Sequence, residues 1–409
     1  MHESRVRARA RALPPAFLEE LARPDLPPAA TYAAIAGLIV LRAVDRWAAA
    51  GCRPLDDLAG AQNAVAALDA GNPARSILGG ALDAMTAPPG DAAAVIDRIA
   101  AYARHLEFDA RYALALQVHR SILAYRGFAA TDAQACESEL RGAFCLRMLA
   151  RLDEARDAYD RAERDARRIG SARTVLRAAL GRALVLMMRG RLDEADAAMR
   201  DLETRAMHDD FPDVLATVLH NRAIIAGMQG RPARAAVELA FRALRLTPDP
   251  ANRERVLFDI GESLRRAGLR APARDAFLIL SCTAQERHLR EHALVMLMRI
   301  AADDGAREMF EHYARLIDPQ EFHVRLRLEH RLQRGYALRA LGDLAGSRAE
   351  FEGVAADAAA AGQGLELQEA QRALAGSSDA VDVPAPDTLS RLADVVESLK
   401  TMREAAVSV

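Results

Sequence analysis

The sequence repeats a pattern of apolar positions that starts with the same five letters, RLDEA, at Arg151 and again at Arg191. Each copy continues with a small residue, then an aromatic residue or Met, then another small or apolar residue: Ala155, Tyr159 and Ala162 in the first copy, and Ala195, Met199 and Leu202 in the second. Steps of four and three residues place these side chains on one face of an α-helix. A helix-like segment also precedes each copy. The pattern therefore predicts helix pairs that repeat every 40 residues.

The same arrangement continues on both sides of these two copies. The small residue near the start of the second helix recurs at Ala113 (a weaker copy), Ala235, Ala273, Ala306 and Ser347. A glycine five residues earlier marks the end of the first helix at Gly190, Gly230, Gly268 and Gly342. Glycine adopts the left-handed turn that ends a helix at little cost. We therefore expect stacked pairs across 131–317 at intervals of about 38–42 residues.

These features resemble the tetratricopeptide repeat (TPR) family. The glycine at the turn, the Ala early in the second helix and the aromatic residue four positions later match that family's pattern, and a small residue lies midway along the first helix at Ala143, Ala183, Ala223, Gly261 and Gly335. The resemblance covers roughly 93–360, although the first-helix Trp is absent and the spacing is that of bacterial TPR-like proteins with 40-residue repeats. It implies an all-α fold, an α-solenoid of stacked antiparallel helix pairs forming a TPR-like superhelix. Each pair then needs an equivalent neighbour to bury its apolar face.

The ends of the chain lack the repeat pattern, so the sequence predicts five regions. They are a basic, Pro-containing arm (1–28), an N-terminal helical cap (29–90), the repeat array (91–375), a linker (376–387) and a C-terminal amphipathic helix (388–409). The last helix carries an apolar stripe of Leu389, Leu392, Val396 and Leu399. Three placements remain open for it: a cap on the end of the array, a plug in the chain's own groove, or a pairing element for a homodimer.

Composition agrees with helices and narrows the partners. Hydrophobic residues make up 51% of the 409 residues but aromatic residues only 5%, so the apolar mass is mostly helix-compatible. A formal net charge of −2 creates no field that attracts nucleic acid or a membrane. The basic arm, with Arg5, Arg7, Arg9 and Arg11, lacks interleaved aromatic residues. We therefore do not expect nucleic acid as a partner.

Cysteine usage and the N-terminus predict a cytoplasmic protein. Cys52, Cys136, Cys145 and Cys282 lie far apart with no C-x-x-C pair, which favours free thiols in a reducing compartment. No apolar run follows the basic arm where a signal peptide needs one. The most apolar stretch, 29–41, ends at Arg42, and a membrane span needs about 20 residues. We expect no membrane span.

One short motif resembles a catalytic site. The letters HLREH contain His288, Glu291 and His292 at the H-x-x-E-H spacing of inverted zinc proteases. The motif lies in a helix that the repeat already explains, and no third ligand is apparent. We expect a solvated helix face, and we assign no catalytic residue, metal or cofactor. A zinc hydrolase stays a distant alternative.

The register of the first helices predicts which side chains face the concave groove. They combine apolar and cationic groups with flexible Met: Phe144, Arg147, Met148, Leu184, Met187, His220, Asn221, Ile224, Met228, Arg255, Phe258, Arg265, Arg299, Tyr336 and Arg339. Such a groove suits an amphipathic or partly acidic peptide. Asn221 matches the Asn with which the TPR family often holds a ligand's backbone, and a solvated role is equally compatible with its sequence context.

These observations predict a non-enzymatic scaffold or adaptor that binds a protein or peptide in the groove. The alternative is a ligand-responsive bacterial regulator, in which peptide or protein binding changes the availability of the C-terminal helix.

Overall fold

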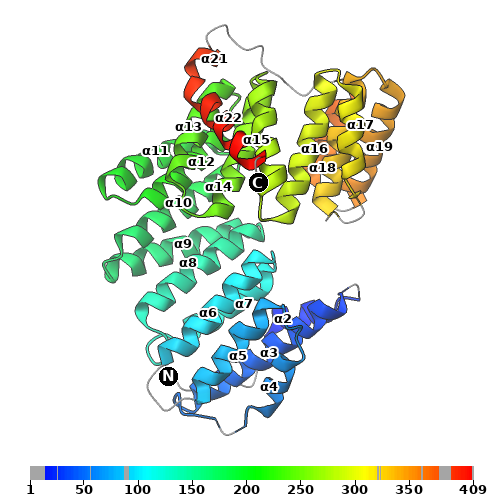
Figure 1. Cartoon of the computed structure of the whole chain (residues 1–409). Helices are drawn as coiled ribbons and strands as arrows, with labels where there is room; N and C mark the ends of the chain where they lie inside the picture. Colours follow the sequence, from blue (N-terminus) through cyan, green and yellow to red (C-terminus); the bar gives the residue numbers. More distant parts are fainter. Residues whose placement is uncertain are drawn as a thin grey trace. The chain divides into compact units, whose positions relative to one another are not determined.

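A computed structural model describes residues 14–24, 26–55, 57–86, 92–319, 322, 324–360, 363–376 and 388–407. Helices joined by short turns make up almost all of these residues, and the described part has no β-strand beyond the isolated pairing of Arg126 with Ala130. The predicted all-α fold of antiparallel helix pairs is confirmed. The chain forms two compact units, Met1–Ala198 and Met199–Val409, and each is described by itself (Figure 1).

The first unit is a series of helices that pack against their neighbours in sequence. Its helices are α2 (Pro15–Leu21), α3 (Pro28–Ala49), α4 (Ala59–Ala66), α5 (Pro73–Thr86), α6 (Ala92–Phe108), α7 (Tyr112–Ala124), α8 (Asp132–Met148), α9 (Leu152–Arg168), α10 (Ala172–Met188) and the first turns of α11 (Leu192–His208). Each helix from α5 to α9 contacts the next, and α8 also contacts α6 and α10. One large apolar cluster extends from Phe17 to Val185.

The second unit continues the pairs. It contains α12 (Pro212–Met228), α13 (Ala233–Leu246), α14 (Pro250–Arg266), α15 (Arg270–Thr283), α16 (Arg287–Asp303), α17 (Arg307–Leu316), α18 (Val324–Ala340), α19 (Leu344–Ala360), α20 (Gly364–Leu374), α21 (Thr388–Arg391) and α22 (Ala393–Val407). Successive helices contact each other from α12 to α17 and from α18 to α20, and α16 contacts α18 directly. The stacking of pairs therefore continues past the short α17.

The repeat shortens along the chain. The first helices of the pairs begin at residues 92, 132, 172, 212, 250, 287 and 324, so the interval falls from 40 to 37 residues. Shorter second helices account for the loss, since α9 and α11 have 17 residues whereas α13 and α15 have 14. Helix α17 has only 10 residues, but the longer connection to α18 keeps the interval at 37. The final interval within 131–317 is thus one residue shorter than expected.

The buried small residue is the fourth residue of the second helix in most pairs. It is Ala115, Ala155, Ala195, Ala236, Ala273 or Ser347, and each is buried. The prediction that Ala113, Ala235 and Ala306 are the small residue at this position is wrong. Ala113 is exposed and the other two are half-buried. Helix α13 begins one residue later after its preceding helix than α9 does, whereas Ala113 and Ala306 lie two and four residues before the fourth residues of α7 and α17. In α17 the fourth residue is Phe310.

The predicted left-handed turns are confirmed. Gly190, Gly230, Gly268 and Gly342 have φ values of 73°, 66°, 72° and 87°. The two earlier pairs have no glycine at this point, and Ala110 (56°) and Ala150 (57°) adopt the same backbone conformation. The fold therefore imposes this turn on an L-residue that resists it.

The N-terminal region is more structured than an arm. Residues 1–13, which include the four arginines, lie outside the described residues. From Pro15 the chain is helical, and Phe17 is completely buried against α3 and its neighbours. The predicted arm of 1–28 therefore ends before α2.

Helix α3 is longer than the 13-residue apolar stretch in the sequence. With 22 residues it is the one helix in the described chain that is long and apolar enough to cross a membrane, by length and composition alone. Half of that apolar window is buried inside the first unit. It also carries the buried Asp45, which accepts a hydrogen bond from the Tyr125 hydroxyl. These contacts are those of a core helix.

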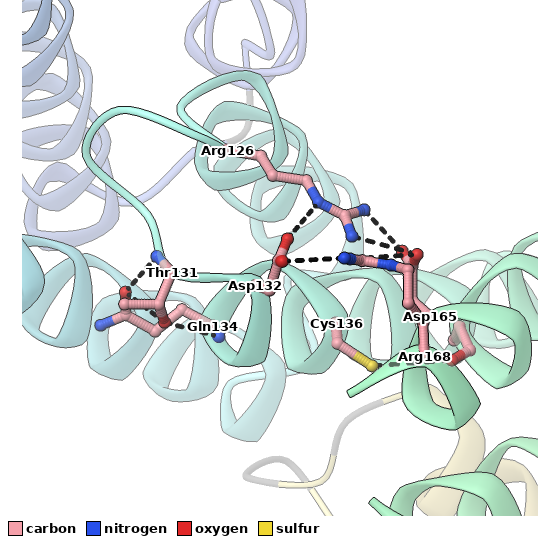
Figure 2. Close-up of polar contacts among 8 residues, drawn as sticks. Arg126, Thr131, Asp132, Gln134, Cys136, Asp165 and Arg168 are labelled. Carbon is pink, nitrogen blue, oxygen red and sulfur yellow. Dashed lines mark hydrogen bonds and ion pairs between the residues drawn. The ribbon is translucent and has the colours of Figure 1, made fainter. Parts of the chain in front are cut away.

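Arginine–aspartate pairs fix the connection between α7 and α8 (Figure 2). Arg126 donates to both oxygens of Asp165 on α9, at 2.6 and 3.0 Å, and to Asp132 at 2.9 Å. Arg168 donates to the other oxygen of Asp132 at 2.9 Å. Thr131 caps α8 in a capping box with Gln134. The irregular loop is thereby attached to the next helix pair.

The C-terminal helix packs on the middle of the second unit. Figure 1 shows α22 along α15, and the two helices are in contact. Leu392, Val395 and Leu399 are buried in the apolar cluster of α12–α16, and Arg403 Nη1 donates to Asp275 Oδ1 at 2.8 Å. The buried stripe contains Val395 in place of the predicted Val396, which is half-buried. Within the second unit, α22 therefore covers an internal second helix, a placement that the sequence did not suggest.

Candidate binding surfaces on the first helices

One face of α8 combines cationic and apolar side chains. Arg141, Phe144 and Met148 follow one another at steps of three and four residues, which is the spacing of one helical face. The Phe144 ring lies beneath two guanidinium groups, with Arg141 at 5.2 Å and Arg147 at 5.3 Å from its centroid. Tyr112 of α7 meets the same ring edge-on at 5.8 Å. These contacts hold an aromatic ring and two cations in fixed positions at the surface.

The face of α10 lies beside that of α8. Arg177 donates to both oxygens of Glu137 at 2.7 and 3.0 Å, and Arg147 Nη1 lies 3.9 Å from the sulfur of Met188. Leu184 is buried between these two contacts along α10. The first helices of two successive pairs therefore form one continuous surface in the first unit.

Large apolar side chains stand exposed at the ends of these helices. Phe108, Met148 and Met188 are the last residues of α6, α8 and α10, and their exposed fractions are 73%, 40% and 44%. In the second unit Met228 ends α12 in the same way. The first helices α6, α8, α10 and α12 therefore each expose a large apolar side chain at their last residue.

The corresponding face of the second unit is more polar and already cross-linked. His220 of α12 and Asp259 of α14 share a hydrogen bond of 2.5 Å between Nε2 and Oδ2. Phe258 stacks on the His292 ring of α16 with centroids 4.3 Å apart. The amide of Asn221 donates to the Thr217 carbonyl of its own helix at 2.8 Å.

A buried polar network lies further along this unit. Arg265 is 1% exposed and its Nε and Nη2 donate to Glu262 at 3.0 and 2.9 Å. On α16, Arg299 donates to Gln333 of α18 at 3.1 Å and lies over the Tyr336 ring at 4.8 Å. The network ties α16 to α18 through side chains that have little contact with solvent.

Two carboxyl groups on this face have pKa values that are shifted in opposite directions from the ordinary value of a glutamate. Burial, together with the neighbouring carboxylates of Glu262, Glu369 and Glu366, raises the pKa of Glu329 to about 6, against a hydrogen bond from Gln333. For Glu262, burial acts to raise the pKa, but Arg265 and Arg266 outweigh it and hold the pKa at about 2. Glu262 is therefore ionised at neutral pH, whereas the pKa of Glu329 lies just below neutral pH.

No protein-family model and no curated protein matches the sequence. Among solved structures, the apo form of RapI matches with a TM-score of 0.49 and 10% identity, covering 88% of this chain and 91% of that one. A Rap protein complexed with Competence and Sporulation Factor gives 0.44 and 10%, covering 90% and 99%. The Pseudomonas aeruginosa pilF structure gives 0.39 and 16%, covering 53% and 88%. The repeated helix pairs, their left-handed turns and the buried small residue of the second helix define the fold.

The chain has a TPR-like fold of stacked helix pairs. Its first helices lie beside one another within each unit, since α8 contacts α6 and α10, and α16 contacts α14 and α18.

The predicted groove residues of this TPR-like chain divide into three groups. Four are buried, namely Leu184, Arg265, Arg299 and Tyr336. Two cations are held by other parts of the chain: Arg255 donates to Glu286 at 2.7 Å, and Arg339 donates to the Ala373 carbonyl at 2.7 Å near the end of α20. The remaining side chains, all with accessible surface, are Phe144, Arg147, Met148, Met187, His220, Asn221, Ile224, Met228 and Phe258. We remove the four buried residues from the ligand-contacting set, because a buried side chain offers a ligand no surface.

The H-x-x-E-H residues do not converge. The ring of His288 pairs with Glu286 at 3.2 Å, Glu291 accepts from Arg287 at 2.7 Å, and His292 stacks on Phe258. Three different partners hold the three side chains, so the zinc hydrolase alternative has no assembled site in this TPR-like array.

Sequence reasoning missed several residues of the first-unit surface. Arg141, Arg177 and Glu137 contribute its charge, and Phe108 and Met188 contribute exposed apolar area. The signal for the apolar pair was present, because both lie 40 residues from Met148. The ion pair between α8 and α10 was not visible, since its members belong to different repeats.

Proposed function

We propose that this chain is a non-enzymatic scaffold that binds a protein or peptide on the first-helix face of its first unit, over α6, α8 and α10. The observation that carries the proposal is the series Phe108, Met148 and Met188, which exposes a large apolar side chain at the end of each first helix. Met adapts to different ligand shapes because its side chain is unbranched and polarisable.

The charges beside this series specify the complementary partner. Arg141 and Arg147 lie over Phe144. Both guanidinium groups retain N–H groups that can donate hydrogen bonds to a carboxylate. The partner that fits is a peptide segment with apolar side chains for the Phe and Met positions and carboxylates for the arginines. It binds in the manner of an amphipathic segment on a helical surface.

A selection from a randomised peptide library on the purified protein tests the proposal. Enriched peptides should combine apolar and acidic residues, and fluorescence anisotropy should show at least tenfold weaker binding to the variant Met148→Glu/Met188→Glu. Met207→Glu is the matched control, since Met207 is also an exposed Met but lies on the second helix α11. Equal loss of binding in both variants would reject this surface.

A second function is supported by the position of α22. Its apolar side chains cover α15, and one ion pair, Arg403–Asp275, links the two helices. In this regulator function, a bound partner changes the availability of α22. Hydrogen exchange of residues 388–407 measures this, because exchange should speed up on peptide binding; unchanged exchange leaves the scaffold function alone.

A further inference from the structure

Three side chains of metal-binding type meet inside the first unit, where they are buried beneath the surface residues that the proposed function uses. Glu107 is at the end of α6, His119 in α7 and Cys145 in α8, and all three are buried. Their ligand atoms lie within 4.8 Å of one another. Three successive helices therefore contribute one carboxylate, one imidazole and one thiol to a single point.

The contacts converge on one carboxylate oxygen. Glu107 Oε1 lies 2.8 Å from His119 Nε2, 3.7 Å from Cys145 Sγ and 3.3 Å from Arg141 Nε. A tetrahedral zinc ion with bonds of about 2.0–2.3 Å places its ligand atoms roughly 3.3–3.7 Å apart. The three atoms are thus close to a zinc-binding arrangement, with the protons of the imidazole and the thiol in the place of the ion.

The hydrogen bonds of the cluster leave one ring nitrogen of His119 without a partner. His119 is 2% exposed, and its Nδ1 has no hydrogen-bond partner among the described residues. A buried polar atom is normally satisfied when a network serves packing only. His119 also lines a cavity of about 160 Å³ whose walls include Leu116, Gly142 and Leu146. Glu107 and Cys145 do not line this cavity, which therefore borders the cluster only on the side of His119.

We propose that Glu107, His119 and Cys145 form a binding site for one zinc ion. Binding replaces the thiol proton, which is released to solvent, and moves the imidazole proton from Nε2 to Nδ1 so that Nε2 can ligate. Arg141 forms an ion pair with the second oxygen, Oε2, of Glu107, which orients the carboxylate as outer partners of metal ligands do. A mixed carboxylate, imidazole and thiolate set suits zinc. The ion would join α6, α7 and α8.

Cobalt titration provides the test, because a thiolate–cobalt bond gives a near-ultraviolet charge-transfer band. The titration uses the double variant Cys52→Ser/Cys282→Ser, which lacks the half-buried and the exposed thiol as competing ligands. We expect a band that saturates at one cobalt per chain and disappears when zinc is added. No saturable cobalt binding by this folded protein would overturn the proposal.

Two further variants locate the ion. Cys145→Ser in the same protein should abolish the band, and His119→Gln should weaken binding at least tenfold. Cys136→Ser is the control, since Cys136 is buried in the same helix but its Sγ contacts the Ala162 carbonyl at 3.6 Å. A band that persists in Cys145→Ser, or one that is lost in Cys136→Ser with the helical circular dichroism unchanged, rejects the assigned ligands.

Discussion

The ring of Tyr159 in α9 fills the space beside Gly181 in α10 where a side chain would otherwise lie. A Cβ on Gly181 would come within 2.6 Å of Tyr159 Cδ1, and the ring itself is buried at 3% exposure. The second helix of one pair thus approaches the first helix of the next at a point where only glycine fits. Gly261 and Gly335 receive Phe277 and Phe351 in a similar way, within their own pairs.

Gly181→Ala should therefore destabilise the first unit. The buried ring cannot move aside freely, so overpacking should lower the free energy of unfolding by about 1–3 kcal/mol, measured by urea denaturation. Gly227→Ala is the control, because a Cβ there meets nothing within 4 Å. That change should be neutral or stabilising by up to about 1 kcal/mol, since Ala is the better helix former. Equal effects at both positions would contradict the close approach.

The left-handed turns give a pair of substitutions with opposite signs. Ala150 and Gly190 occupy the same turn 40 residues apart, with φ of 57° and 73°. Ala150→Gly should stabilise by up to about 1 kcal/mol because it removes backbone strain, less the added entropy of the unfolded chain. Gly190→Ala should destabilise by about 1–2 kcal/mol, although its Cβ meets nothing within 4 Å. Thermal denaturation measures both, and shifts of the same sign would refute the backbone explanation.

Glu329 should make the second unit less stable as pH rises. Its folded pKa of about 6 lies above the ordinary 4.5, so the folded state binds the proton more tightly. Stability is then lost between pH 4.5 and 6 and stays reduced above that range, by roughly 2 kcal/mol.

Glu329→Gln should recover this loss, because the neutral amide keeps an acceptor for Gln333. The midpoint of thermal unfolding should rise at pH 7.5 and match the wild type near pH 4. Glu308→Gln, an exposed carboxylate of α17, serves as the control. A stability gain from Glu329→Gln that persists at pH 4 would show that the pKa of the Glu329 carboxyl group is not raised.

The sequence predicts the local features of this fold well, because each depends on neighbouring residues. Gly190 and Gly342 mark turns through their own backbone freedom, and the spacing of Ala155 to Tyr159 defines one helix face. The register fails at Ala235, where α13 begins one residue late. A connection one residue longer leaves no mark in the apolar pattern.

Contacts between distant residues explain the remaining failures. Arg265 was placed at the surface because charged side chains usually are, yet it is buried with Glu262 three residues before it. That spacing was visible in the sequence, but its burial depends on the packing of the neighbouring helices. Likewise, Glu107, His119 and Cys145 meet only because three helices stack in order. The burial and the partners of charged and metal-binding side chains are therefore the least predictable features of a repeat array.

The C-terminal helix supplies the final prediction. Leu392, Val395 and Leu399 are buried with the cluster around α15, and each such side chain contributes about 1.5–3 kcal/mol as an upper range. Deletion of residues 388–409 exposes the covered side of α15. We expect a lower midpoint of thermal unfolding and increased binding of a hydrophobic dye, because apolar surface becomes accessible.

Light scattering of the full and the shortened chain distinguishes packing within one chain from exchange between two. The contact of α22 with α15 in its own chain predicts the monomer mass for both forms. A mass that halves on deletion would show that α22 binds α15 of a second copy. The substitution Arg403→Ala provides a milder control, since it removes only the ion pair to Asp275 and leaves the apolar contacts in place. A partly exposed ion pair contributes about 0–1 kcal/mol, so this variant should keep both the mass and nearly all of the stability. If Arg403→Ala instead released the helix as fully as the deletion does, the ion pair, and not the apolar stripe, would hold α22 in place.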